Sequence, residues 1–149
     1  MLPEFFDGRN LPEGLHEAGW GEFEERFGSS SEKRISLCRQ LRDLLQRAKD
    51  CSFRGVVVFG SFVSAKLEPG DFDLLWLLAR DIDRSLLSES CRELLDSSTS
   101  RDRFGCDVFD GEDGSEFVTK SFPSPTMGFG WDKETKTPRG LVILRMEGI

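Results

Sequence analysis

The residues of this chain that could do chemistry gather in one short segment. An apolar run at residues 55–59 ends in Gly60-Ser61, and Asp71-Phe72-Asp73 opens a second apolar run after residues 62–70. A strand that ends in Gly-Ser and turns into a helix presents backbone N–H groups that suit phosphate oxygens. Gly60 would allow the backbone to approach a phosphate closely, and Ser61 would add a hydroxyl donor.

The two aspartates of this segment indicate a cation site. Asp71 and Asp73 are two positions apart on an extended segment, so both carboxylates leave the same face. Carboxylates this close repel each other unless a cation lies between them, and hard divalent cations prefer oxygen ligands. Asp107 is the best candidate for a third ligand, because a charge on the apolar strand 104–109 needs a partner. A second Asp-x-Asp, at residues 81–83, is interpreted as helix capping.

This arrangement resembles the signature of the nucleotidyltransferase superfamily, which includes polymerase β, the aminoglycoside nucleotidyltransferases and the minimal bacterial nucleotidyltransferases. Their signature is a hydrophobic strand, Gly-Ser, a gap of this length, Asp-x-Asp, and a third acidic residue on a later strand. Gly60-Ser61, Asp71-Phe72-Asp73 and Asp107 stand at those places here, and the resemblance covers about residues 33–110.

Further segments look like an uncharacterised bacterial branch of the same superfamily and extend the resemblance to most of the chain. They are Leu11-Pro12-x-Gly14-Leu15-His16, Glu22-Phe23-x-x-Arg26-Phe27-Gly28 and Pro138-Arg139-Gly140.

The resemblance implies transfer of a nucleoside monophosphate from an NTP, with ATP as the first candidate, to an acceptor hydroxyl on a protein or an RNA. Two Mg²⁺ ions, or Mn²⁺ in their place, would serve the reaction. Minimal relatives often belong to toxin–antitoxin or defence modules, so a cognate toxin or antitoxin is an implied partner.

The same resemblance assigns roles to individual residues. Asp71 and Asp73 would hold both metal ions, and Asp107 would ligate the ion that activates the acceptor and would accept its proton. The triphosphate would be held by Gly60 and Ser61. Lys66 is a candidate to replace the arginine that many members carry after Gly-Ser, the alternative being an exposed lysine on a short helix. Arg139 is a candidate substrate contact, the alternative being an exposed Pro-Arg-Gly turn.

Two departures from the family keep a second function open. Many members carry an arginine just after Gly-Ser, where this chain has Phe62. Relatives with known substrates also add a C-terminal helical domain, whereas only residues 108–149 follow Asp107. The alternative is a non-catalytic protein of the same fold that binds a nucleotide or a partner, as an antitoxin would. The base could be enclosed by a partner protein or by the loop aromatics Phe117, Phe122, Phe129 and Trp131.

Composition excludes other classes. With His16 as the sole imidazole and no Tyr, carboxylates are the favoured catalytic groups. The excess of 27 acidic over 20 basic side chains, a net charge of −7, argues against a broad DNA-binding surface. No apolar run approaches the ~18 residues of a membrane span. The first residues lack a signal-peptide pattern, so we expect a cytoplasmic protein whose four cysteines are reduced.

Helices and strands alternate along the chain. A short helix is predicted at residues 22–27, and Ser29 with Glu32 predicts a capping box for a longer helix that ends near Ala48. The basic side chains of this helix, Arg34 among them, are expected in solvent. Strands are predicted at 55–59, 71–78, 104–109 and 140–145, with a short helix at 61–66 and a third helix capped by Asp81 or Asp83.

The order of elements predicts an α/β (α+β) fold, with a mixed sheet of about four strands flanked by helices. The length of 149 residues favours a single domain. We divide it into an irregular lead-in with a short helix at 1–32, a catalytic core at 33–110, and a long loop with a C-terminal strand at 111–149.

Overall fold

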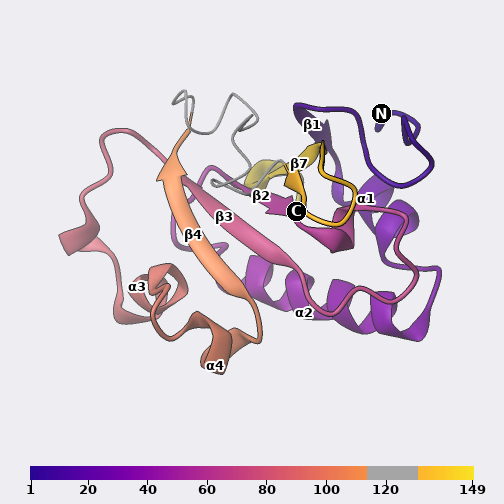
Figure 1. Ribbon diagram of the computed structural model, residues 1–149. Helices are drawn as coiled ribbons and strands as arrows, with labels where there is room; N and C mark the ends of the chain where they lie inside the picture. The colour runs from indigo at the N-terminus through magenta and orange to yellow at the C-terminus, as the bar shows by residue number, and fades with distance from the viewer. Residues whose placement is uncertain (114–130) are drawn as a thin grey trace.

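A five-stranded mixed sheet forms the centre of the structure, a computed structural model that describes residues 1–113 and 131–149 (Figure 1). The strand order is β1-β7-β2-β3-β4, in which β2 runs antiparallel to both neighbours while the β1–β7 and β3–β4 pairs are parallel. The strands are β1 (Leu15–Ala18), β2 (Gly55–Phe59), β3 (Asp73–Leu78), β4 (Asp107–Glu112) and β7 (Leu141–Arg145). The predicted α/β class is confirmed, with one strand more than expected.

Helices cover one face of this sheet. Figure 1 shows α2 running along the sheet, with α3 and α4 beside β4. Alternate strand residues such as Val56, Leu74 and Trp76 point to this face and pack in one large core with Leu41 and Leu45 of α2. The helices are α1 (Trp20–Phe27), α2 (Glu32–Arg47), α3 (Glu89–Leu95) and α4 (Ser100–Phe104), with 3₁₀ turns η1 (Ser61–Val63), η2 (Arg84–Leu86) and η3 (Met146–Gly148).

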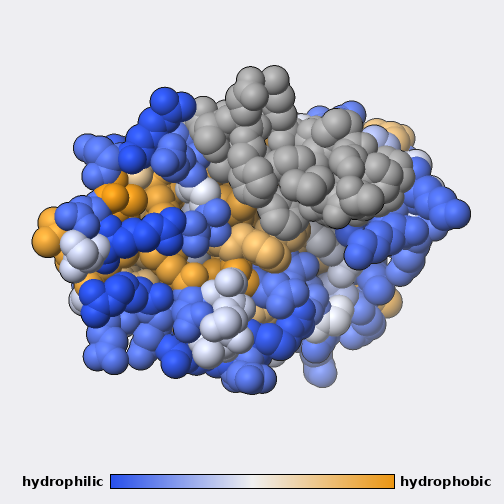
Figure 2. All heavy atoms as spheres, turned by 60° about the vertical axis from the view of Figure 1, so that its left-hand side comes forward, coloured by the Kyte–Doolittle hydropathy of each residue, from blue (hydrophilic) through white to orange (hydrophobic). Residues whose placement is uncertain are grey.

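The other face of the sheet is also apolar. Its members come from the intervening strand positions and form a second, smaller cluster of Val57, Phe59, Leu75, Leu77, Leu141 and Ile143. Because both faces are apolar, these strands appear in the sequence as continuous hydrophobic runs. Figure 2 shows that apolar groups also gather between hydrophilic ones on one side of the surface.

The N-terminal lead-in is more ordered than expected. Residues 15–18, predicted to be irregular, form the edge strand β1 by pairing in parallel with β7. The segment has little β propensity of its own, so its conformation depends on the neighbouring strand. A separate two-stranded hairpin, β5 (Trp131–Asp132) with β6 (Thr137–Pro138), precedes β7.

The boundaries of the long helix were only partly predicted. The cap of α2 is Ser31, whose Oγ accepts a hydrogen bond from Arg34 N at 3.1 Å, so the prediction of Ser29 as cap was wrong. The apolar side of the helix, including Leu37, Cys38 and Leu44, is buried as its spacing predicted.

The helical segments that follow β2 and β3 are shorter than expected. Asp83 caps only the 3₁₀ turn η2, Ser88 caps α3, and the predicted helix at 61–66 is the single turn η1. The unexpected helix α4 ends at Gly105, whose φ of 73° is left-handed, so β4 begins later than the predicted strand at 104–109.

The cysteines correct another expectation. Cys51, after α2, and Cys91, in α3, form a disulfide across a sequence separation of 40, so these two are not reduced thiols. Cys38 and Cys106 are free and buried. Within residues 1–113 and 131–149, no helix has the length and apolar character needed to cross a membrane.

Candidate functional site

The sheet brings the predicted acidic residues to one end. Asp73 begins β3 and Asp107 begins β4, and the parallel pairing places the two directly opposite each other. Because β2 is antiparallel to β3, its last residue, Phe59, also lies opposite Asp73, and Gly60 follows at the same end. Asp71 stands just before β3. The strand register thus makes neighbours of Gly60, Asp73 and Asp107, which are far apart in the sequence.

Arg101 of α4 joins two of these carboxylates. Its Nη1 pairs with Asp71 Oδ2, while its Nη2 lies 2.7 Å from Asp107 Oδ2 and its Nε donates to Asp107 Oδ1 at 3.2 Å. The contact with Asp107 is bidentate, the geometry that a guanidinium offers a carboxylate. No sequence pattern pointed to Arg101, because α4 was not expected and its arginines look like ordinary surface charges.

Asp73 is a half-buried member of the acidic group. Burial, followed by the negative charges of Asp71 and Asp107, raises the pKa of its carboxyl to about 6, although Arg101 opposes this. Its Oδ1 atom is buried and has no hydrogen-bond partner in the described part of the chain. A carboxylate in this position gains from any cation that comes close to it.

Gly60 shapes the turn beside Asp73. Its φ of 91° and ψ of −166° are adopted readily only by glycine. A Cβ at this position would lie 3.1 Å from Asp73 Oδ2, so the missing side chain also leaves room for that carboxylate. Ser61 opens η1 directly after this turn. The predicted Gly-Ser turn and the acidic group are therefore in contact.

The loop after the turn is held by Arg34. This residue is only 3% exposed, and its guanidinium donates to the carbonyl oxygens of Phe27, Phe62, Ser64 and Lys66 at 2.5–3.0 Å. The expectation that Arg34 lies in solvent was wrong. Its guanidinium binds backbone carbonyl groups, so Arg34 fixes the course of the chain from Phe62 to Lys66.

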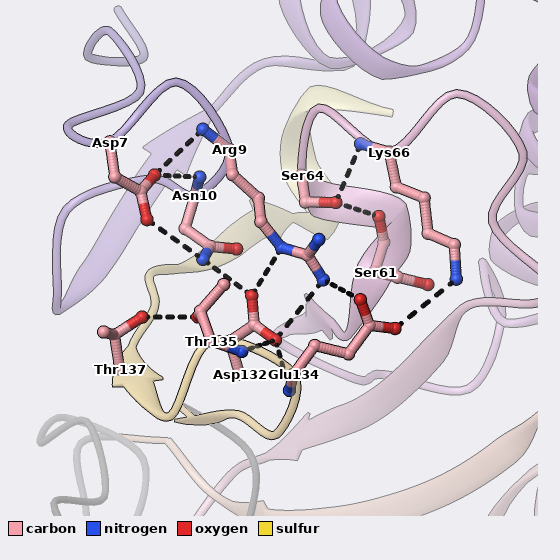
Figure 3. Close-up of polar contacts among 10 residues, drawn as sticks. All are labelled: Asp7, Arg9, Asn10, Ser61, Ser64, Lys66, Asp132, Glu134, Thr135 and Thr137. Atoms are coloured by element: carbon pink, nitrogen blue, oxygen red, sulfur yellow. Dashed lines mark hydrogen bonds and ion pairs between the residues drawn. The ribbon is translucent and has the colours of Figure 1, made fainter.

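Lys66, predicted to bind triphosphate, lies in a charged network on the same loop (Figure 3). Its Nζ is 4.0 Å from Glu134 Oε1, and Glu134 also accepts from Arg9 Nη2 at 2.8 Å. Figure 3 shows these side chains converging from the N-terminal lead-in, the η1 loop and the β5–β6 turn. Glu134 therefore partly neutralises the cation that was assigned to a phosphate.

Asp132 is the buried centre of that network. It accepts from Arg9 Nε at 2.6 Å and from Asn10 Nδ2 at 2.9 Å, and it caps the β5–β6 turn through the backbone N–H of Glu134. Burial raises its pKa, but the hydrogen bonds from Asn10 and Arg9 outweigh this and hold the pKa below the usual range of an aspartate. Asp132 therefore anchors the β5–β6 hairpin, and its carboxylate is already engaged in hydrogen bonds there.

Arg139, the candidate substrate contact, is half-buried after β6. Its Nε is buried and has no hydrogen-bond partner among the described residues. Burial lowers the pKa of its guanidinium, while the charges of Asp132 and Asp73 oppose that shift. Arg139 is thus close enough to Asp73 for their charges to interact, and its Nε is a donor without a partner in the described residues. The loop aromatics Phe117, Phe122 and Phe129 and the side chain of Trp131 lie outside the described residues.

The acidic group has the chemistry of a magnesium site but is occupied by a guanidinium. Three carboxylates supply hard oxygen ligands, and the unpartnered Oδ1 of Asp73 is suited to a cation. In the described part of the chain, however, no three His, Cys, Asp or Glu side chains are placed to hold one ion. Arg101 takes the charge that such an ion would supply to Asp71 and Asp107. Asp71 and Asp107 would be free to take a divalent cation only after that side chain has moved.

The Cys106 thiol next to Asp107 offers no alternative chemistry. Burial, followed by the charge of Asp73, raises its pKa to about 12, so it stays protonated and is a poor nucleophile. Carboxylates and cationic side chains remain the reactive groups of the site.

Fold and site together define an α/β protein with an acidic group and a glycine turn at one end of a mixed sheet. A family model described as "Family of unknown function (DUF6932)" matches residues 3–145, so the chain belongs to this family. Comparison with curated proteins and with solved structures found no match.

Proposed function

We propose that this protein is a metal-dependent nucleotidyltransferase, which moves a nucleoside monophosphate from an NTP to an acceptor hydroxyl. The observation that carries the proposal is the convergence of four residues at one end of the sheet: Asp73 and Asp107 lie opposite each other on β3 and β4, Gly60 directly follows β2, and Asp71 stands just before β3. The acceptor is a protein or an RNA, and ATP is the first nucleotide to test. A role in a toxin–antitoxin or defence module belongs to the same proposal.

Asp71, Asp73 and Asp107 would hold Mg²⁺, or Mn²⁺ in its place. When bound, the metal supplies charge stabilisation at the attacking and leaving oxygens of an in-line phosphoryl transfer. Burial of Asp73 strengthens its interaction with a cation, because water screens the charge poorly there. Asp107, whose side chain is 47% exposed, is the candidate acceptor of the hydroxyl proton.

Phosphate binding is assigned to the opposite side of Asp73. The Gly60 turn lies against Asp73, and Ser61, which follows it directly, would supply a hydroxyl donor. The unpartnered Nε of Arg139 adds a cationic donor. Lys66 contributes only if it leaves Glu134. These cationic and backbone donors would balance the charge of a triphosphate.

The alternative is a non-catalytic protein that binds a nucleotide or a partner. The observation in its favour is the Arg101 bridge, which satisfies Asp71 and Asp107 without any metal. A site that keeps its guanidinium in place could still bind a partner, but it would carry no two-metal chemistry.

We place the protein in the cytoplasm, because its proposed NTP substrate is held there. The Cys51–Cys91 disulfide stands against this placement, since cytoplasmic reductants disfavour such bonds. The oxidation state of these two cysteines in cells therefore decides this part of the proposal.

The test measures Mg²⁺–ATP binding by calorimetry and transfer from α-labelled NTPs to protein or RNA in a lysate. We expect Asp71→Asn and Asp73→Asn to lose at least about tenfold in affinity. Asp81→Asn is the matched control, because it alters the other Asp-x-Asp motif, which follows the opposite end of β3. If the site variants bind as the wild type does, the site is wrongly assigned. Binding without a labelled product from any of the four NTPs would favour the non-catalytic alternative.

The Gly60→Ala variant tests the contribution of the turn to binding separately from that of the carboxylates. The new methyl group would require a backbone conformation that L residues rarely adopt and would press on Asp73, so we expect weaker Mg²⁺–ATP binding. Gly70→Ala is the control in the same connection, because no atom lies within 4 Å of the added Cβ. Equal binding by both variants would remove the Gly60 turn from the site.

A further inference from the structure

Arg101 pairs with carboxylate oxygens of the acidic group that a metal ion would also need as ligands. Its guanidinium contacts one oxygen of Asp71 and both oxygens of Asp107. Those oxygens are the ones that the proposed function assigns to a divalent cation.

We propose that Arg101 is a built-in competitor of the divalent cation, which closes the acidic site while it is paired with Asp71 and Asp107 and opens it by swinging away. This inference rests on the proposed function, because it concerns the metal of that site. The arrangement makes metal loading conditional on a single side chain.

The guanidinium can leave without unfolding its helix. The Arg101 side chain is 53% exposed, and exposed ion pairs are weak. The helix itself is fastened elsewhere: Phe104 is buried, and Ser100 Oγ accepts a hydrogen bond from Val108 N in β4. Opening therefore requires a rotamer change of one long side chain, while α4 stays against the sheet.

A neighbouring arginine supplies a matched control. Arg103 lies on the same short helix and is similarly exposed, but its partner is Glu93 of α3 at 3.4 Å. Replacing either arginine by glutamine removes one positive charge from α4. Only the Arg101 change releases Asp71 and Asp107.

The probe is Mn²⁺ alone, titrated into the full chain and followed by electron paramagnetic resonance. We expect Arg101→Gln to lower the Kd for Mn²⁺ about threefold to tenfold, as loss of a competing exposed bridge allows. Arg103→Gln should leave the Kd within about twofold of the wild type. Arg101→Lys keeps the charge but loses the bidentate contact, so its Kd should fall between those of the wild type and Arg101→Gln.

The outcomes separate this inference from the proposed function. If Asp73→Asn loses Mn²⁺ but Arg101→Gln and Arg101→Lys bind no more tightly than the wild type, the metal site stands and the competition is refuted. If Asp73→Asn binds as the wild type does, or if no variant binds Mn²⁺, the metal site itself fails. Circular dichroism without metal checks that each variant is folded, and the lysine variant replaces the glutamine variant if the latter is not.

Discussion

Asp73 carries the strongest electrostatic conflict among the described acidic residues. It is half-buried, it faces two further carboxylates, and its Oδ1 has no hydrogen-bond partner in the described residues. A side chain in this position destabilises the metal-free protein whenever it is ionised. Such a cost is typical of groups placed for binding rather than for stability.

The raised pKa of Asp73 predicts a pH dependence of stability. Its folded pKa of about 6 lies above the reference value of 3.8, so the folded state binds the extra proton, and stability falls as the pH rises from about 4 to 6. Asp73→Asn removes this cost and should stabilise the metal-free protein by about 1–3 kcal/mol at pH 7, but not below pH 4. Urea unfolding in EDTA across this pH range measures the difference.

Asp81→Asn, which changes an exposed aspartate, is the control for the dependence of stability on pH. A gain for Asp73→Asn that is the same at pH 3.5 and pH 7 would contradict the electrostatic explanation and would point to packing. The same Asn variant should lose metal, so stability and binding should change in opposite directions.

At the scale of elements, the η1 loop depends on a residue of α2. The Arg34 guanidinium donates to three carbonyl groups of this loop, those of Phe62, Ser64 and Lys66, and to one at the end of α1. The loop carries Ser61 and Lys66, so its course sets the geometry of the proposed phosphate side. A buried cation on one helix thus determines the shape of a connection that is distant in sequence.

Removing Arg34 should therefore be costly. Arg34→Ala leaves buried carbonyls without donors and should reduce the free energy of unfolding by about 2–4 kcal/mol, as measured by urea denaturation. Arg39→Ala, on the exposed side of the same helix, should stay within about 0.5 kcal/mol of the wild type. If the two variants lose equal stability, Arg34 does not hold the loop.

The elements differ in how far the sequence predicts them. The strands β2, β3 and β7 and the apolar side of α2 follow from local patterns, because burial on the sheet selects continuous apolar runs and a helix selects 3–4 spacing. The edge strand β1 could not be predicted, since pairing with β7 determines it. The Ser29 cap failed because Ser31 Oγ accepts the hydrogen bond from the backbone N–H of Arg34, while Ser29 Oγ instead donates to the carbonyl of Glu25.

The residues of the site also differ in how far the sequence predicts them. Gly60, Asp73 and Asp107 were singled out by the conjunction of an apolar run, Gly-Ser and Asp-x-Asp with a later acidic residue. The structure brings them to one end of the sheet, while their role stays a prediction. Arg101 was not found, since nothing local distinguishes an arginine that bridges carboxylates from one in solvent. Arg139 was singled out by sequence, and the structure adds its unpartnered Nε and its electrostatic proximity to Asp73.

At the scale of the whole molecule, the Cys51–Cys91 disulfide ties the chain after α2 to α3. Cross-links that close long loops restrict the unfolded chain and typically add about 2–4 kcal/mol to stability. The bond therefore contributes to the stability of the unit that carries the acidic site.

Reduction should reveal that contribution. We expect dithiothreitol to lower the free energy of unfolding of the wild type by about 2–4 kcal/mol and to leave a Cys51→Ser/Cys91→Ser variant unchanged. Alkylation under denaturing conditions followed by mass measurement should find two of the four cysteines free in the oxidised protein. Four free cysteines in protein taken directly from cells would show that the bond is not formed there.

The register of β3 against β4 has a consequence for folding. Side chains alternate across a strand, so a slip of β4 by one residue would turn Asp107 away from Asp73 and bring Val108 to the site. Only the correctly paired edge strand assembles all of the carboxylates. A ligand that binds them would stabilise that pairing and no other, and would act as a template that selects the native alignment of β4.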